Sequence, residues 1–337
     1  MVWEHDINIF RIDKTEIPTL ELKQYLDKQL FENYKKLFSK QHKWINCEND
    51  FADVDDFVME NWLERLYFER LERKSKSIED MLQHSKHDWE AVLFKLLAKN
   101  FGLKVNGEAF YSLAQSIEFS MIRKVQSNLQ QLEALLFGQA SLLEDDVQDH
   151  YFTRMVKDYR FLKQKFQLSN QYVLPLQFFR LRPPNFPTIR LSQLAMLYHT
   201  HLNLFSKVME AQTKDELYHL FNIKTSKYWE THYNFEKESK TSVKTLTKSF
   251  IDLVLINTIL PLKFCYAKHL NREVDAQIIG LSTAIASEDN SIINAFNSLK
   301  KVSHSALQSQ ALLQLKTEYC DKNKCLQCAV GNALIIK

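Results

Sequence analysis

Apolar side chains recur at helical spacing over most of the chain. Residues 23–40 hold four of them at intervals of four, four and three, on one face of a helix: Leu26, Leu30, Tyr34 and Leu37. The same periodicity predicts further helices over residues 57–71, 89–101 and 110–137. The pattern therefore predicts a mainly α protein, a globular array of several helices.

Candidate helix ends accompany these runs. Asp53 or Asp55 can cap the helix that begins near residue 57. Gly102 is placed to end the helix over residues 89–101, and Gly138 to end the helical region over residues 110–137. The acidic run at residues 144–146 is expected to cap the next helix.

The first 22 residues differ from the rest. Residues 2–5 are a short apolar start, and residues 17–22 are typical of a strand, so together they predict a β-hairpin. Two strands alone are marginally stable in water. We therefore expect residues 1–40, the hairpin plus one helix, to be the remnant of an α/β domain. Residues 41–337 are expected to form a helical domain with a C-terminal cysteine cluster.

Two later segments differ from this pattern of amphipathic helices. Residues 171–190 contain four of the 6 prolines, which predicts an extended loop followed by a helix from Leu191. Residues 250–266 are strongly apolar but include Asp252 and Lys263, which favours a buried helix over a membrane span.

Composition narrows the function classes. Among 337 residues there are only 5 Gly, and none has the spacing of a dinucleotide fingerprint, a phosphate loop or a nucleophile elbow. The formal charge of +3 permits a nucleic-acid partner without demanding one. The charged start of the chain is unlike a signal peptide, so we expect a cytoplasmic protein.

Three of the 5 cysteines lie together near the C-terminus: Cys320, Cys325 and Cys328. Two thiolates separated by two residues can grip one metal ion from a tight turn, and a third close by can join them. Tetrahedral zinc or a four-iron cluster needs four ligands. The spacing predicts a metal site but does not choose between zinc and iron–sulfur.

The fourth ligand must come from upstream, because no Cys or His follows Cys328. Cys47 is our candidate, with Cys265 and His304 as rivals. Cys265 lies in an apolar helical run, where a buried core thiol is the simpler interpretation. The alternative to a metal site is three free thiols.

Two groups of basic residues are candidates for binding phosphate or nucleic acid. The first surrounds the proline loop: Arg180, Arg182 and Arg190. The second is expected on one helical face: Lys237, Lys240, Lys244 and Lys248. The competing interpretations are arginines that brace the loop and a solvated helix face.

Glu21 and Lys23 are weak catalytic candidates. They flank one residue at a strand end, so their side chains share a face, as in the E-x-K of metal-dependent nucleases. Chance is the competing explanation of so short a motif.

Several stretches together resemble one bacterial family, labelled domain of unknown function 2851. They are residues 17–23, 43–48, 62–66, 132–140, 182–187 with Arg190, and 319–328. Longer members of that family carry an N-terminal extension similar to the PD-(D/E)xK nuclease core. The resemblance implies that this chain lacks that segment, starts at a later strand of the sheet, and is not catalytic alone.

The resemblance also bears on the cysteines. Some nucleases of that superfamily hold a four-iron cluster with one upstream Cys and a C-terminal trio, an arrangement similar to Cys47 with Cys320, Cys325 and Cys328. The spacing within the trio departs from theirs. Two function classes remain: the helical, metal-stapled part of a nucleic-acid-processing protein, or a helical binding or scaffold protein with structural zinc.

Overall fold

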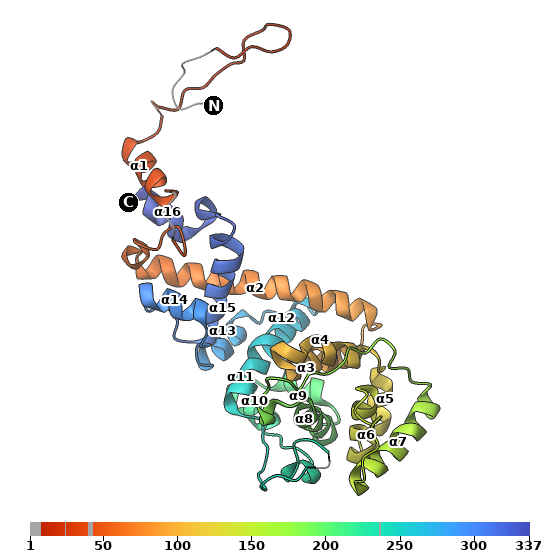
Figure 1. Cartoon of the computed structure of the whole chain (residues 1–337). Coiled ribbons are helices and arrows are strands. Elements are labelled where there is room, and N and C mark those ends of the chain that lie inside the picture. Colours follow the sequence, from red (N-terminus) through yellow and green to blue (C-terminus); the bar gives the residue numbers. More distant parts are fainter. Residues whose placement is uncertain (1–7, 24, 40–42, 236) are drawn as a thin grey trace. The chain divides into compact units, whose positions relative to one another are not determined.

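The computed structural model describes residues 8–23, 25–39, 43–235 and 237–337. Helices make up most of them, which confirms the predicted mainly α fold (Figure 1). The chain forms two compact units. Unit 1 combines Met1–Arg70 with Ser287–Lys337, and unit 2 is Leu71–Ala286. The division into residues 1–40 and 41–337 stays a prediction.

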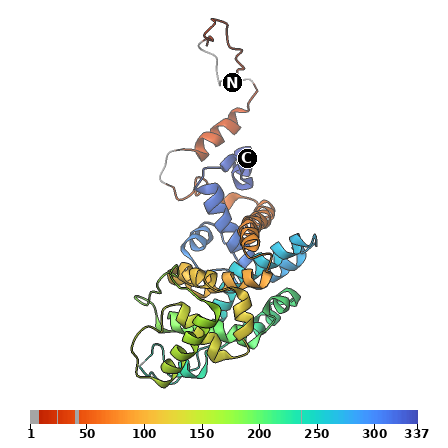
Figure 2. The same cartoon turned by 90° about the vertical axis from the view of Figure 1, so that its right-hand side faces the viewer.

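Unit 1 draws its helices from both ends of the chain. They are α1 (Lys28–Leu37), the first part of α2 (Asp56–His84), α14 (Ser291–Leu299), α15 (Ala306–Gln314) and α16 (Ala329–Ile336). Helices α1 and α16 lie side by side in both views (Figures 1 and 2). The Asn33 amide joins them by donating to the Ile335 carbonyl at 3.1 Å.

The start of α2 follows from its sequence. Asp55 Oδ1 accepts hydrogen bonds from the backbone N–H groups of Phe57 and Val58, as a capping carboxylate does. Asp55, not Asp53, is therefore the cap. In unit 1 the helix buries a stripe at helical spacing: Met59, Trp62, Leu63 and Leu66.

Unit 2 contains the remaining helices. They are α3 (Trp89–Phe101), α4 (Leu103–Gln115), α5 (Phe119–Val125), α6 (Leu129–Gln139), α7 (His150–Phe166), α8 (Pro187–Thr200), α9 (Leu204–Glu210), α10 (Lys214–Leu220), α11 (Lys248–Val254), α12 (Leu260–His269) and α13 (Asp275–Ala284). Helix α8 is buried along most of its length and packs against α3 and α6. It is the central helix of this unit.

The apolar segment at residues 250–266 lies inside unit 2. Helices α11 and α12 are joined by a π-helical turn, Leu255–Ile259. Pro261 accounts for this wide turn, because proline lacks an N–H and its ring clashes with the carbonyl four residues earlier. Lys248–His269 is long and apolar enough to cross a membrane, but 78% of its most apolar window is buried in the fold, as in a core helix.

The predicted hairpin is not shown as two strands. Residues 2–5 lie outside the described part of the chain. The neighbouring residues form an isolated antiparallel bridge, Phe10 with Glu16. Lys14 N–H donates to the Arg11 carbonyl at 2.9 Å in the turn that closes it, and Ile17 N–H donates to the Ile9 carbonyl at 2.8 Å beside the bridge.

Three other local predictions are wrong. The cap of α7 is Asp149 rather than residues 144–146, since Asp149 Oδ1 accepts from Phe152 N–H at 2.7 Å. Gly138 lies within α6 instead of ending it. Helix α8 begins at Pro187, because proline fits the first helical position, where no N–H is needed.

The predicted lysine face does not exist. Residues 237–247 form no helix, and isolated bridges pair His232 with Glu238 and Lys224 with Thr245. Lys248 is the first residue of α11. The lysines therefore do not share a helix face.

Gly138 provides a test of how closely α6 and α7 pack. A Cβ at Gly138 would lie 2.2 Å from ring carbons of Tyr159, whereas a Cβ at the exposed helical Gly280 meets nothing within 4 Å. We expect Gly138→Ala to lower the free energy of unfolding by about 1–3 kcal/mol through overpacking. Gly280→Ala should raise it by about 0.5–1 kcal/mol through helix propensity. Chemical denaturation measures both, and an equally stabilised Gly138→Ala would refute the close approach.

Candidate metal centre

A reversal of the chain after α15 brings the three C-terminal cysteines together. Helix α15 continues through a π-helical segment, Leu315–Cys320, which a short turn follows. Asn323 takes a left-handed conformation with φ 52°, and its N–H donates to the Cys320 carbonyl at 3.1 Å. Lys324 N–H donates to the Tyr319 carbonyl at 2.9 Å. The turn therefore leads the chain from Cys320 back to the next two cysteines.

Cys325 begins a 3₁₀ turn, Cys325–Gln327, and Cys328 is the residue just before α16. Gly331 lies in the first turn of α16 against this segment. A Cβ there would be 2.2 Å from the Cys325 carbonyl oxygen. Only glycine lets α16 start this close to the backbone of the cysteine loop.

The segment that carries Cys47 is fixed by turns and by aromatic contacts within unit 1. Glu48 Oε2 accepts from Trp44 N–H at 2.6 Å, and Asp50 N–H donates to the Cys47 carbonyl at 3.1 Å. The rings of Trp44 and Phe51 pack on Phe296 of α14, with centroids 4.7 and 5.5 Å away. These contacts give Cys47 a defined position.

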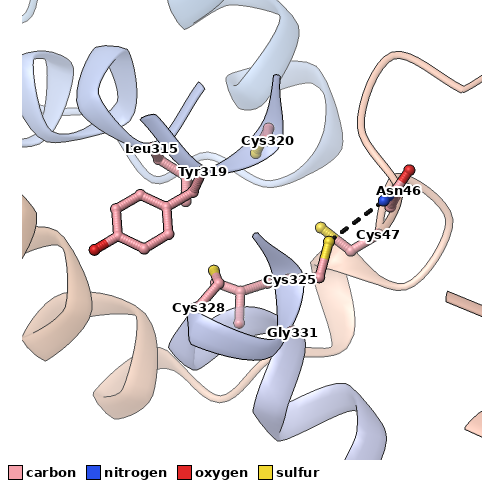
Figure 3. Close-up of a pocket in the computed structure, with 9 residues that line it drawn as sticks. Asn46, Cys47, Leu315, Tyr319, Cys320, Cys325, Cys328 and Gly331 are labelled. Carbon is pink, nitrogen blue, oxygen red and sulfur yellow. Dashed lines mark hydrogen bonds between the residues drawn. The ribbon is translucent and has the colours of Figure 1, made fainter. Parts of the chain in front are cut away.

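All four predicted ligands line one pocket in unit 1 (Figure 3). The other lining residues include Leu315, Tyr319 and Val330, and the space enclosed is about 20 Å³. This is room for roughly one water-sized body. Figure 3 shows Cys47 on the segment before α2, and the other three cysteines on the C-terminal segment.

Asn46 joins the two segments. Its Nδ2 donates to Cys325 Sγ at 3.4 Å (Figure 3). The same Nδ2 donates to Asn323 Oδ1 at 3.1 Å. Tyr319 helps to hold the C-terminal segment against α2. Its hydroxyl donates to Glu69 at 2.8 Å, and its ring packs edge-on against Trp62.

Burial and mutual proximity disfavour thiolates in the pocket when nothing else is bound. Burial, with the Cys328 and Cys325 thiols nearby, raises the pKa of Cys47 to about 12. Burial and the other three thiols also raise the pKa of Cys320. Burial raises the pKa of Cys328, but the backbone N–H groups of Gly331 and Val330 and the Trp62 indole N–H act against the rise.

The thiols share a pocket without closing round one point. Among the residues that the structure describes, no group of three or more His, Cys, Asp or Glu side chains is positioned to hold a metal ion. The pocket therefore brings the four cysteines together, and a metal bound by them stays a prediction.

Neither rival ligand belongs to the pocket. Cys265 is buried in α12, in unit 2, with its sulfur 3.9 Å from the Ser75 carbonyl oxygen. His304 is exposed on the turn before α15 and does not line the pocket.

Trp62 is a residue of the site that the sequence did not indicate. A buried N–H facing a thiol depends on the approach of two distant segments.

The other candidate residues are dispersed. Glu21 is half-buried and Lys23 exposed in the segment before α1. Arg180 and Arg182 are exposed on the proline loop of unit 2. Lys240 and Lys248 are exposed as well.

Two of the basic candidates are buried instead. Arg190 lies in α8, and Lys244 donates to the carbonyls of Trp229 and Glu230. Neither is available to the backbone of a nucleic acid at the surface.

Replacing Asn46 tests whether it joins the two cysteine segments. Asn46→Ala removes both hydrogen bonds, so we expect a loss of about 1 kcal/mol in the free energy of unfolding of unit 1. Asn61→Ala is the control, because the exposed Asn61 bonds the Phe57 carbonyl within its own helix. Equal effects of the two changes in chemical denaturation would contradict the role of Asn46.

Comparison with known proteins places the chain in a family. No curated protein and no solved structure matches it. A family model does match, over residues 1–291, a span that includes Cys47 and ends before Cys320. The chain therefore belongs to the family described as protein of unknown function DUF2851.

Proposed function

We propose that the chain is a metal-stapled helical protein, in which Cys47, Cys320, Cys325 and Cys328 hold one structural metal centre. The observation that carries the proposal is that four of the 5 cysteines, from opposite ends of the sequence, line a single pocket. Four thiolates fill a tetrahedral coordination shell and leave no open position for substrate. The centre would therefore supply stability rather than catalysis.

The donor set and its surroundings fit such a centre. All four candidate ligands are sulfur, which suits zinc or a four-iron cluster. The buried Trp62 indole N–H has no conventional acceptor among the described residues, and it favours the Cys328 thiolate. Backbone N–H groups from Val330 and Gly331 favour it too. In metal sites, N–H donors that surround the ligands stabilise the metal-bound thiolates.

Metal binding would also offset the electrostatic cost of forming thiolates in this buried pocket. A bound cation favours the thiolate form, so binding would displace the thiol protons that burial retains. The gain would appear as folding energy of unit 1, on the order of 10 kcal/mol for structural zinc. Because thiolates need reducing conditions, the proposal goes with a cytoplasmic location.

Metal analysis of the purified chain tests the staple. We expect about one zinc ion, or one four-iron cluster, per chain, and the loss of most of it in Cys47→Ser and Cys325→Ser. Cys265→Ser is the matched control, since that buried thiol lies in the other unit. Iron and sulfide with visible absorbance would identify a cluster, and a colourless protein with zinc would identify the ion. A wild-type chain prepared without oxygen that holds neither would refute the staple.

A second candidate function, binding of single-stranded nucleic acid, is favoured by the proline loop of unit 2. Phe179 is 78% exposed and Tyr172 is 85% exposed. The Arg180 guanidinium lies over the Phe179 ring, 5.1 Å from its centroid, and Arg182 is exposed nearby in sequence. Exposed aromatic faces next to arginines suit stacking on bases and pairing with phosphates.

Fluorescence anisotropy with a labelled single-stranded oligonucleotide tests this second function. We expect Phe179→Ala to weaken binding on the order of tenfold, because base stacking contributes about 1–3 kcal/mol. Replacing Arg180 and Arg182 by Ala should also flatten the dependence on salt. The exposed α7 pair, Arg154 and Arg160, replaced by Ala serves as the charge-matched control. Equal losses in both double variants would reject the loop as the binding surface.

A further inference from the structure

Arg190 is a buried cation with no acidic partner in the part of the chain that the structure describes. It lies in α8 with 7% of its surface exposed. One terminal nitrogen, Nη1, donates to Gln193 Oε1 at 3.0 Å, and Nη2 donates to Asn185 Oδ1 at 2.6 Å. Its guanidinium carbon is 3.9 Å from the centroid of the Phe250 ring. Its Nε has no hydrogen-bond partner in the described part of the chain.

Among the described residues, this arrangement leaves the positive charge of Arg190 unpaired and some of its N–H donors without an acceptor. A guanidinium has five N–H donors, and the two amide oxygens engage one each. Buried charges in proteins are ordinarily paired, because an unpaired one loses its hydration without compensation. Burial lowers the pKa of Arg190 to about 10. The charge at this position therefore lacks a counter-ion among the described residues.

Arg190 lines a cavity of about 620 Å³ in unit 2. The wall contains hydroxyl side chains from the segment before α11 and its first turn: Ser242, Thr245, Thr247 and Ser249. Phe250, Leu253 and Val243 add apolar surface. None of the lining residues is Asp or Glu.

Lys244 adds a second positive charge to the same wall. It is buried, and its ammonium donates to the carbonyls of Trp229 and Glu230 and lies 4.3 Å from the centroid of the Tyr233 ring. Glu230 is the acidic group that acts on it, and that carboxylate also pairs with Lys224 at 3.4 Å. Lys244 thus contributes positive charge, while Arg190 contributes positive charge and N–H donors available to a ligand.

We propose that this cavity binds a small phosphate monoester, with the phosphate group on Arg190 and the organic part against the apolar wall. Arginine pairs with phosphate through parallel N–H donors. A phosphate offers three acceptor oxygens and nearly two charges, which matches two cations and a hydroxyl-lined wall better than one carboxylate does. The volume is within the range of small-molecule sites.

The proposal is independent of both functions proposed above. The thiol pocket belongs to unit 1, and Arg180 and Arg182 do not line this cavity. A chain that holds no metal, or that does not bind oligonucleotides, can still bind the phosphate monoester.

Calorimetric titration of the full chain tests the site. The probes are adenosine 5′-monophosphate, ribose 5-phosphate and inorganic phosphate, with adenosine and acetate as probes without a phosphate group. We expect the two esters to bind, adenosine and acetate not to bind, and inorganic phosphate to bind more weakly because it lacks the organic part. The esters should also raise the melting temperature of the wild-type chain.

Two variants locate the site. Arg190→Gln should weaken ester binding on the order of tenfold or more, because hydrogen bonds to a charged group are lost. Ser242→Asp places a negative charge on the exposed rim and should weaken binding without disturbing the fold. Ser127→Asp, at an exposed position of unit 2 outside the cavity, is the matched control and should bind as the wild type does.

Three outcomes would overturn the proposal. The first is that no phosphate-bearing probe binds. The second is that acetate binds as well as the esters. The third is that Ser242→Asp binds like Ser127→Asp, a result that stands even if Arg190→Gln fails to fold.

Discussion

The arrangement of unit 1 depends on the meeting of two distant parts of the chain at the thiol pocket. Cys47 lies before α2, and the other three cysteines lie between α15 and α16. If a metal joined them, as proposed, the cross-link would restrict the unfolded chain by about 5–6 kcal/mol in the chain-entropy model. Around the pocket, Asn46 joins the two segments by hydrogen bonds, Tyr319 bonds Glu69 of α2, and the Lys316 ammonium lies over the Trp44 ring.

Buried cations show two solutions to the same problem of lost hydration. In unit 2 the Lys263 ammonium donates to the carbonyls of Val208, Met209 and Ala211 at 2.9–3.0 Å. It thereby satisfies the carbonyls at the end of α9, where a helix lacks partners of its own. Lys244 likewise donates to backbone carbonyls. Arg190 differs because its partners are two amides, which leave donors free inside a cavity.

The sequence predicts well where local chemistry decides the structure. The helix at α3 matches its predicted bounds, Trp89–Phe101, because Asp88 caps its start and apolar residues fill it. The choice of Cys47 over Cys265 also rested on local context: Cys265 lies in an apolar helical run, where a core thiol is expected, and the structure buries it in α12. Two inferences needed no knowledge of the tertiary structure: that the C-terminal trio lacks a fourth ligand, and that Cys265 is a core thiol.

Where tertiary contacts decide, the sequence misleads. The lysines at 240, 244 and 248 have helical spacing, yet the backbone of this segment pairs with Lys224. Thr241, Ser242, Thr245 and Thr247 lie among them, and such residues favour turns and caps over helix interiors. The spacing could not reveal that Lys244 points its ammonium at two carbonyls, nor that the hydrogen-bond partners of Arg190 are amides. Both facts depend on the folded structure around these side chains.

The order of units along the chain has a consequence during protein synthesis. All of unit 2, Leu71–Ala286, leaves the ribosome before Ser287, so it can form its core first. Unit 1 must wait for its last residues, because α16 and three cysteines of the pocket are made at the end. Throughout that interval the other cysteines that line its pocket are not yet available to Cys47. A message truncated near residue 287 would therefore yield a folded unit 2 attached to a unit 1 that has no means of closing.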